Sequence, residues 1–421
     1  MLSRIRNVFP RAIDIVETVI PRTIAAILLA APMMAQQVTF YRDVLPILQN
    51  RCQECHREGQ MAPMAFSTYQ QTRPWAKAIR EAVRTNKMPP WFADPCCGKF
   101  SNDRSLTPAE RETLARWADS GAQQGREADA PPPKSWPQGW NIGTSNTAPD
   151  AVIEMPRAFH VPKSGAVEYQ YFIVPTGFQQ DRWVQAVEVR PSERKVVHHA
   201  VVYLREPGDT WTGGPTRADI LAVYAPGSAP DVYPAGMAKL VKAGSDLVFE
   251  VHYTPSGKAV DDRIKVGMVF AKAPPAKRVL TLQMDNEKFL IPAGDRDFRI
   301  SVWGTLPNDA LLLGFFPHMH LRGTAFEYTR ILNSGLPETL LRVKPYDFYW
   351  QLYYRLAEPM PLKKGTRLNW IATYDNSAAN PRNPDPAADV RYGHQSWDEM
   401  MVGFFDVAVD ASIDKPSFFV R

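Results

Sequence analysis

The stretch Val196-Val-His-His-Ala-Val-Val202, together with Leu247-Val-Phe-Glu-Val-His-Tyr253, decides the fold class of most of this 421-residue chain. Both are short runs of β-branched and aromatic residues, which favour β-strands. Similar runs recur between Pro and Gly turns after residue 150, with no helix signals between them. Short strands at regular spacing predict antiparallel β-sandwiches. We expect strands at 168–174, 182–189, 195–204, 246–254, 263–271, 298–304, 310–317, 325–332, 366–374 and 400–409.

The composition is that of a globular protein with several domains. Hydrophobic residues make up 45% and charged residues 22%, which excludes a disordered chain. The 38 prolines disfavour a mainly helical fold. The net charge of +5 is small for this length and no basic block is present, so nucleic acid is not an expected partner. The chain after residue 150 is long enough for two sandwiches, which we place at 151–278 and 279–421.

The first 35 residues have the pattern of a secretory signal peptide. Four arginines precede a nine-residue apolar run, Thr23–Ala31, and Met33-Met-Ala35 offers a cleavage site. The apolar run is too short to cross a bilayer, which takes about 20 residues. We therefore predict an exported protein, periplasmic or secreted, without a stable membrane span. The alternative is an uncleaved membrane anchor.

Cys52-Gln-Glu-Cys55-His56 is a CxxCH motif, the attachment signature of haem c. Two thiols at this spacing reach the two vinyl groups of one haem, and the next residue offers an imidazole to the iron. A chance CxxC or a partial zinc site is the alternative. Zinc would need two further ligands nearby, and Cys96 and Cys97 are the only other cysteines in the chain.

The residues around this motif predict a small helical domain. The spacing of Trp75, Ile79 and Val83 gives one apolar helix face. Thr107, Pro108 and Glu110 provide an N-cap, a first-turn proline and a capping box for a last helix. Residues 36–127 therefore resemble a class I cytochrome c domain carrying one covalent haem c. Its sixth ligand should be a thioether, for which we favour Met88 in Lys87-Met-Pro-Pro-Trp91 over Met61 and Met64.

Two other features of the N-terminal part are less specific. Residues 128–150 are rich in Pro, Gly, Ser and Asn, which predicts a semi-extended linker. Cys96 and Cys97 are adjacent in an expected loop. They could form a vicinal disulfide, contact a metal or remain ordinary thiols.

The histidines of the β region form three groups. His318 and His320 end an apolar strand, and residues i and i+2 of a strand point to the same face. His198 and His199 are neighbours, so joint ligation of one ion needs a bulge or a strand end. His252 stands alone in its strand, where a histidine is more often structural. No cysteine follows Cys97, which excludes a His₂Cys blue-copper site; imidazoles with a thioether favour copper over zinc or magnesium.

The order of these groups resembles the copper type II ascorbate-dependent monooxygenases, the class of dopamine β-monooxygenase and peptidylglycine α-hydroxylating monooxygenase. The matching residues are His198-His199, then His252, then His318-Met-His320, then Asp398-Glu-Met400. The resemblance covers residues 151–421. The disulfides of the family are absent here, and its substrate-binding residues find no match.

The resemblance implies two jelly-roll sandwiches, two copper ions and a solvent-filled cleft between the coppers. One copper would take His198, His199 and His252, and the other His318, His320 and Met400, with Met401 as the second choice for the thioether. The implied reaction is O₂-dependent hydroxylation of an sp³ C–H bond in a small organic substrate. No acid–base residues beyond the copper ligands are implied.

The cytochrome would deliver the two electrons that each turnover needs, and it would receive them from an external donor. Attachment in one chain raises the effective concentration of the donor domain. Two other functions are compatible with the sequence: an electron-transfer or copper-handling protein without oxygenase activity, and a module whose β domains bind a glycan or a protein.

Overall fold

A computed structural model describes residues 37–136, 139–142, 148–211 and 219–414. Val38–Arg421 forms one compact unit. The expected signal peptide at 1–35 lies outside the described residues. Among the described helices, none has the length and apolar character needed to cross a bilayer.

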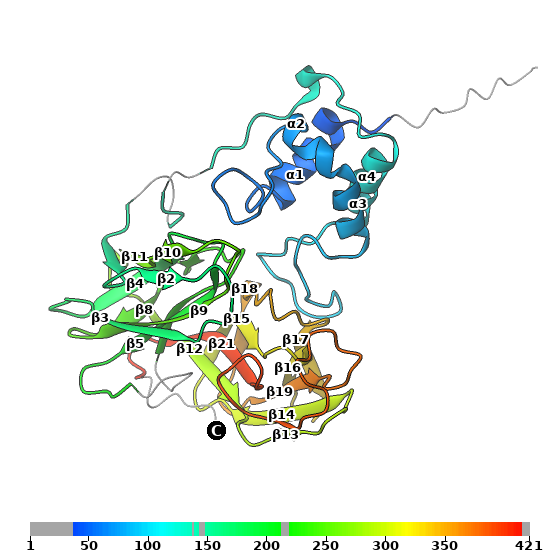
Figure 1. Cartoon of the computed structure of the whole chain (residues 1–421). Coiled ribbons are helices and arrows are strands. Elements are labelled where there is room, and N and C mark those ends of the chain that lie inside the picture. Colours follow the sequence, from blue (N-terminus) through cyan, green and yellow to red (C-terminus); the bar gives the residue numbers. More distant parts are fainter. Residues whose placement is uncertain (1–36, 137–138, 143–147, 212–218, 415–421) are drawn as a thin grey trace, which may run out of the picture. The chain divides into compact units, whose positions relative to one another are not determined.

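The helical region follows the sequence prediction closely (Figure 1). Thr107 caps the last helix, and both hydrogen bonds of its capping box with Glu110 are present. The helices pack on buried Phe40, Leu48 and Trp117. The elements are η1 (Phe40–Val44), α1 (Leu45–Arg51), α2 (Tyr69–Thr72), η2 (Arg73–Trp75), α3 (Ala76–Arg84), α4 (Pro108–Asp119) and η3 (Glu127–Asp129).

The remainder of the chain is β-structure, as predicted (Figure 1). The first half contains β1 (Ala151–Glu154), β2 (Phe159–Val161), β3 (Gln170–Pro175), β4 (Arg182–Arg190), β5 (Val197–Arg205), β6 (Asp219–Tyr224), β7 (Asp231–Val232), β8 (Met237–Val241), β9 (Asp246–Tyr253), β10 (Val260–Asp262) and β11 (Lys265–Phe270). The second half contains β12 (Lys277–Asp285), β13 (Leu290–Ile291), β14 (Phe298–Thr305), β15 (Ala310–His318), β16 (Gly323–Ile331), β17 (Pro337–Val343), β18 (Tyr354–Leu362), β19 (Arg367–Tyr374), β20 (Val390–Arg391) and β21 (Val402–Asp410).

The strands form two sandwiches, each with its own apolar core. In the first, the sheet β3-β9-β5-β6 packs on β1-β11-β4-β8 around Val202, Phe249 and Val266. In the second, the sheet β14-β19-β16-β17 packs on β12-β21-β15-β18 around Phe315 and Trp370. Pairing is antiparallel throughout the described strands except where β8 meets β12 in parallel. That contact makes one layer of each sandwich part of a single nine-stranded sheet, and the expected junction at 278/279 falls at the start of β12.

All ten predicted strands are confirmed, each within a few residues of its expected bounds. The other eleven described strands were not predicted: β1, β2, β6, β7, β8, β10, β12, β13, β17, β18 and β20. Strand β18 contains Pro359 and Pro361, and prolines in a sequence usually indicate a turn rather than a strand. It can hold them because it lies at the edge of the nine-stranded sheet, where one side of the backbone needs no partner.

A segment between the helices belongs to the second sandwich. The backbone of 91–103 pairs with β17 and β18, with the Asp94 amide donating to the Arg342 carbonyl and the Ser101 amide to the Arg355 carbonyl. Trp91 packs on Tyr354 with ring centroids 5.0 Å apart. Cys96 and Cys97 are joined in a disulfide within this segment.

Residues 139–142 of the predicted linker are held against the first sandwich. A Cβ on Gly267 of β11 would lie 2.7 Å from the Trp140 ring, so the missing side chain makes room for the indole. Ile142 is buried, and the Asn141 amide donates to Glu188. Residues 139–142 are therefore anchored rather than extended.

Candidate metal centre

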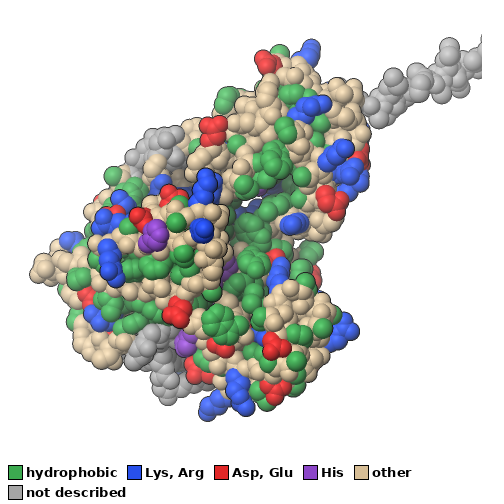
Figure 2. Space-filling view, in the orientation of Figure 1, with side chains coloured by type: hydrophobic (Ala, Val, Ile, Leu, Met, Phe, Trp, Pro, Cys, Tyr) green, Lys and Arg blue, Asp and Glu red, His purple; other side chains and the backbone are tan. Residues whose placement is uncertain are grey.

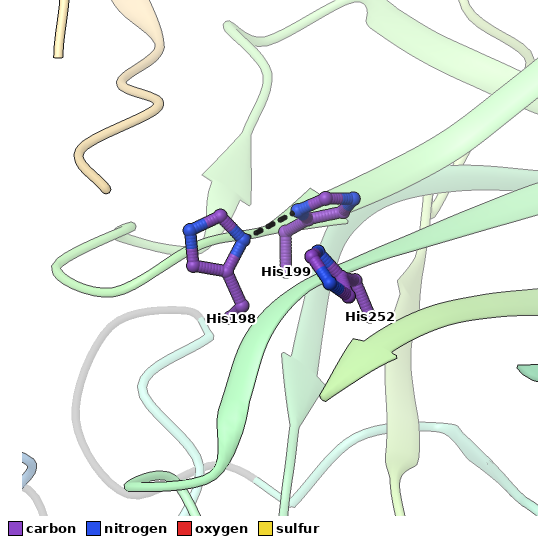
Figure 3. Close-up of side chains that lie close together, drawn as sticks. All are labelled: His198, His199 and His252. Atoms are coloured by element: carbon purple, nitrogen blue, oxygen red, sulfur yellow. Dashed lines mark hydrogen bonds between the residues drawn. The ribbon is translucent and has the colours of Figure 1, made fainter. Parts of the chain in front are cut away.

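Three histidines of the first sandwich converge on one point (Figure 3). His198 and His199 lie on β5 and His252 lies on the neighbouring strand β9. The register of β5 against β9 shifts between Val197 and His199, so β5 carries one extra residue there. This irregularity is the bulge that joint ligation requires, because a regular strand would point the two neighbouring imidazoles to opposite faces.

The geometry of this cluster suits a single ion. One ligand atom from each imidazole lies within 4.8 Å of the other two. The Nδ1 atoms of His198 and His199 are 3.0 Å apart, and His199 is paired with His252 across the strands. Tyr169 stacks on the His252 ring at 4.7 Å and holds its orientation.

Burial keeps these imidazoles neutral, which is the form that binds a metal. Desolvation, followed by the neighbouring histidines, lowers the pKa of His198 to about 3 and that of His252 to about 4. The same causes hold the pKa of His199 well below its usual value. His198 Nε2 and His252 Nδ1 are buried without a hydrogen-bond partner. Buried polar atoms are normally satisfied, so these orphaned nitrogens fit a metal ion.

A second group lies where β15 ends. His318 is the last residue of β15, and the rings of His318 and His320 have centroids 5.2 Å apart. Each Nδ1 is engaged: His318 with Gln351 Oε1 at 2.8 Å and His320 with the Asp398 carbonyl at 3.3 Å. Such contacts orient an imidazole and leave Nε2 for a metal. His320 Nε2 is buried and has no partner.

The structure separates the two candidate thioethers. Met400 lines a small pocket together with His318, whereas Met401 is fully buried in the core of the second sandwich. The two neighbours face opposite sides just before β21 begins. Met400 is therefore the residue placed beside the His318–His320 pair.

Glu399 holds this second group together. Its carboxylate accepts hydrogen bonds from the backbone amides of His320 at 2.9 Å, Arg322 at 2.6 Å and Met400 at 3.3 Å. The side chain is fully buried, and burial raises its pKa to about 8. One carboxyl group thus ties the end of β15 to the segment that carries Met400.

The two groups lie next to each other. The rings of His199 and His318 have centroids 6.0 Å apart, and Phe348 stacks on His198 at 4.8 Å. The pocket lined by both of these groups has a volume of about 30 Å³, enough for a water molecule or two. Phe316, Phe404 and the tyrosines of β3 and β5 narrow this pocket.

Several residues of this centre have no signal in the sequence. Phe348 and Gln351 come from the loop between β17 and β18, and Tyr169 precedes β3. Nothing in their local sequence distinguishes them from core or loop residues. His394 lines the small pocket, whereas His160 is exposed on β2 and pairs with Asp261.

The CxxCH motif begins at the end of α1, where Cys52 is the C-cap residue. Cys52 and Cys55 are not joined in a disulfide. His56 Nδ1 contacts the Met64 carbonyl at 3.2 Å and its ring stacks on Phe66, which leaves Nε2 as the available ligand atom. Met88 lines a hollow with Trp91 and Phe92, away from the one that Cys55 lines. Met61 lies in the same small hollow as Cys55.

Comparisons with known proteins add little. No protein-family model matches the chain, and no curated protein matches it. Among solved structures, a recombinant N-glycanase F (PNGase F) aligns over 63% of this chain and 98% of its own, with a TM-score of 0.30 and 9% identity. A structure of infectious bursal disease virus, Gx strain, aligns over 64% of this chain and 74% of its own, with a TM-score of 0.19 and 8% identity. Similarity at these scores bears on neither the fold nor the function.

Proposed function

We propose that this chain is an exported copper monooxygenase with a fused cytochrome c domain. The observation that carries the proposal is the convergence of five histidines from two sandwiches, with three ring nitrogens left buried and unpartnered. Leaving a buried polar atom unpaired costs about 1–3 kcal/mol, so three in one centre point to a ligand that satisfies them. Histidine and thioether ligands without cysteine favour copper.

In this proposal His198, His199 and His252 hold one copper ion, and His318, His320 and Met400 hold the other. Bound copper supplies O₂ activation and the redox chemistry for C–H hydroxylation. The protein's own residues supply the rest: Tyr169 and Gln351 orient imidazoles, and Glu399 fixes the second ligand group. The phenyl rings of Phe316 and Phe404 line the pocket and limit the space in it.

The helical region is the proposed cytochrome c domain, and the two β-sandwiches are the proposed jelly-roll domains. Cys52 and Cys55 would hold one haem covalently, with His56 as the axial ligand. This domain would pass electrons from an external donor to the copper centre. Met88 remains the proposed sixth ligand, and the competitor is Met61, which lines the same hollow as Cys55.

Metal analysis of the matured protein, with EPR, tests the copper sites. We expect two copper ions per chain and a nitrogen-rich, tetragonal Cu(II) spectrum without the thiolate signature of blue copper. His252→Ala should remove one of the two ions, and His160→Ala, on an exposed histidine, should remove none. A value near one copper in the wild type would refute the two-site proposal.

The cytochrome assignment has its own test. Matured protein should show the spectrum of one covalent haem c, with a sulfur-to-iron charge-transfer band near the red end. Met88→Ala should abolish this band, and Met64→Ala should retain it. If the band persists in Met88→Ala, the sixth ligand of the iron is Met61 or Met64 instead.

Electron transfer to O₂ through both centres is the test of the activity itself. Reduced, copper-loaded protein is mixed with O₂ and a panel of small organic substrates, and haem reoxidation is followed. We expect a substrate-dependent rate that falls strongly in His318→Ala.

One observation favours the alternative, an electron-transfer or copper-handling protein without oxygenase activity. The pocket between the histidine groups, about 30 Å³, is smaller than an organic substrate. Equal reoxidation rates in the wild type and His318→Ala, with every substrate, would support this alternative.

A further inference from the structure

A second hollow, separate from the histidines, lies beside the CxxCH motif. Its volume is about 750 Å³, within the range of about 300–1,000 Å³ typical of sites for small molecules. One wall is the loop that follows His56, and the others are the loop between β4 and β5 and the start of β11. Six basic side chains line it against two acidic ones, Glu58 and Glu193: Arg57, Arg190, Arg194, Lys195, Arg263 and Lys265.

Part of this positive charge is not neutralised by nearby carboxylates, although Arg190 is paired with Glu188. Arg263 and Lys265 share one partner, Glu154. Arg194 donates to the neutral amide oxygen of Gln60 at 2.9 Å, and no ion pair is found for Lys195 among the described residues. The cavity therefore carries a net positive potential, which a concave wall of low dielectric concentrates.

Arg190 lines the cavity and is only partly compensated by its neighbours. Its Nη1 is buried without a hydrogen-bond partner, and the nearest carboxylate oxygen, on Glu188, is 3.6 Å away. The guanidinium cannot swing out freely because it lies over the Trp140 ring at 5.2 Å. The Trp140 ring packs directly against Gly267. This buried donor has no hydrogen-bond acceptor among the described residues, and Glu188 is the acid paired with it.

Arg57 is fixed in a similar way on the opposite wall. It donates to the backbone carbonyls of Gln53 and Glu54 and stacks on Trp136 at 4.1 Å. Burial lowers the pKa of both Arg57 and Arg190, and the nearby Arg194 adds to the effect. The positive side chains of Arg57, Arg190 and Arg194 therefore repel one another, and a bound anion would reduce this repulsion.

We propose that this cavity binds a small molecule bearing two or more carboxylate or phosphate groups. Arginine binds carboxylate and phosphate groups well because its planar guanidinium can donate two parallel hydrogen bonds to one such group. Arg57 directly follows His56, so the bound anion would lie beside the haem-attachment motif. The inference does not depend on the copper centre or on an attached haem, because every residue it uses belongs to the polypeptide.

Calorimetric titration of the full chain with citrate, and separately with inorganic phosphate, tests the proposal at low ionic strength. We expect saturable binding with one site, and weaker binding as NaCl is added, because salt screens charge pairs. Replacing two cavity arginines, Arg190→Gln with Arg194→Gln, should weaken citrate binding about tenfold or more, since both changes remove positive charge and charge-assisted donors from the cavity.

The control removes the same charge elsewhere. Arg299→Gln with Lys363→Gln alters two exposed cations outside the cavity and should leave the affinity unchanged. Lys195→Gln, at an exposed position, should weaken binding about threefold with no effect on folding. Absence of saturable heat with either anion, or equal losses in the cavity and control variants, would overturn the proposal. Copper content and haem spectra are measured separately, so failure here leaves the proposed enzyme activity standing.

Discussion

The two histidine groups are built by different means. His198, His199 and His252 lie within paired strands, and one bulge and one cross-strand pair set their spacing. His320 and Met400 lie beyond the ends of β15 and before β21, where no strand pairing positions them. Glu399 takes over that task with three hydrogen bonds to backbone amides. The first group therefore depends on sheet register, and the second depends on one buried carboxyl group.

The largest expected effect follows from removing that carboxyl group. Glu399→Ala leaves three buried backbone amides unsatisfied, so we expect a loss of about 3–5 kcal/mol in the free energy of unfolding. Urea unfolding measures this loss. Metal analysis should show loss of the second ion while the three-histidine site stays loaded. Glu399→Gln keeps an acceptor oxygen and should recover part of the stability and part of the second ion. An equal loss of both ions in Glu399→Ala would show that the two histidine groups are not independent.

Disrupting the sheet-built group should leave the second group intact. His199→Ala removes the central imidazole of the first cluster, and we expect loss of one ion with a fall in stability of no more than about 2 kcal/mol. The reason is that β5 keeps its pairing with both β9 and β6. EPR of the remaining Cu(II) should match that of the His318 site alone. His394→Ala, on the rim of the pocket, serves as the control.

The pH dependence of stability should distinguish the imidazoles from the carboxyls in metal-free protein. His198, with a pKa lowered to about 3, and His252, lowered to about 4, stay neutral when folded, whereas the unfolded chain takes up protons below about pH 6.5. Stability should therefore rise with pH from about 4 to 6.5, by about 1.4 kcal/mol per pH unit for each net proton.

The buried acids act in the opposite direction. Glu250, with a pKa raised to about 7, and Glu399, raised to about 8, keep their protons when folded, and the unfolded chain releases them above about pH 4.5. Below pH 6.5 the five buried histidines dominate the pH dependence, because they outnumber the two acids, and stability rises with pH. Above pH 6.5 the dependence comes mainly from the two acids, so stability should fall toward pH 8. Urea unfolding across pH 4–9 should show a maximum near pH 6.5–7. A curve that rises steadily to pH 8 would contradict this assignment.

The smallest effect concerns a single orienting contact. Gln351→Leu removes the hydrogen bond to His318 Nδ1 and should weaken the second metal site about 10–100-fold, as loss of such contacts does elsewhere. Competition with a copper chelator measures the affinity of each site. The three-histidine site should be unaffected, and Gln351→Glu, which keeps an acceptor, should bind nearly as well as the wild type. An equal weakening of both sites would point to a general loosening of the interface.

Strand positions were predictable from the sequence because alternation and β-branched composition are local properties. The ten predicted strands and the capped helix α4 all rest on signals within a few residues. Strand β18 was missed because its prolines are tolerated only at a sheet edge, and the edge is known only once the sheet is assembled. The segment 91–103 was assigned to the helical domain for the same reason, since its partners lie about 250 residues away in β17 and β18.

The sequence by itself determined the residue types of the centre and the order in which they occur: two adjacent histidines, one single histidine, a His-x-His pair and a methionine. It also determined that joint ligation by His198 and His199 would need a bulge or a strand end, because neighbouring strand residues point to opposite faces. Only the tertiary structure decided that the bulge is present, that Met400 rather than Met401 faces the pocket, and that the two groups meet. These outcomes depend on the packing of two sandwiches through distant segments, and no local pattern encodes which side chains a folded interface brings within a few ångströms of one another.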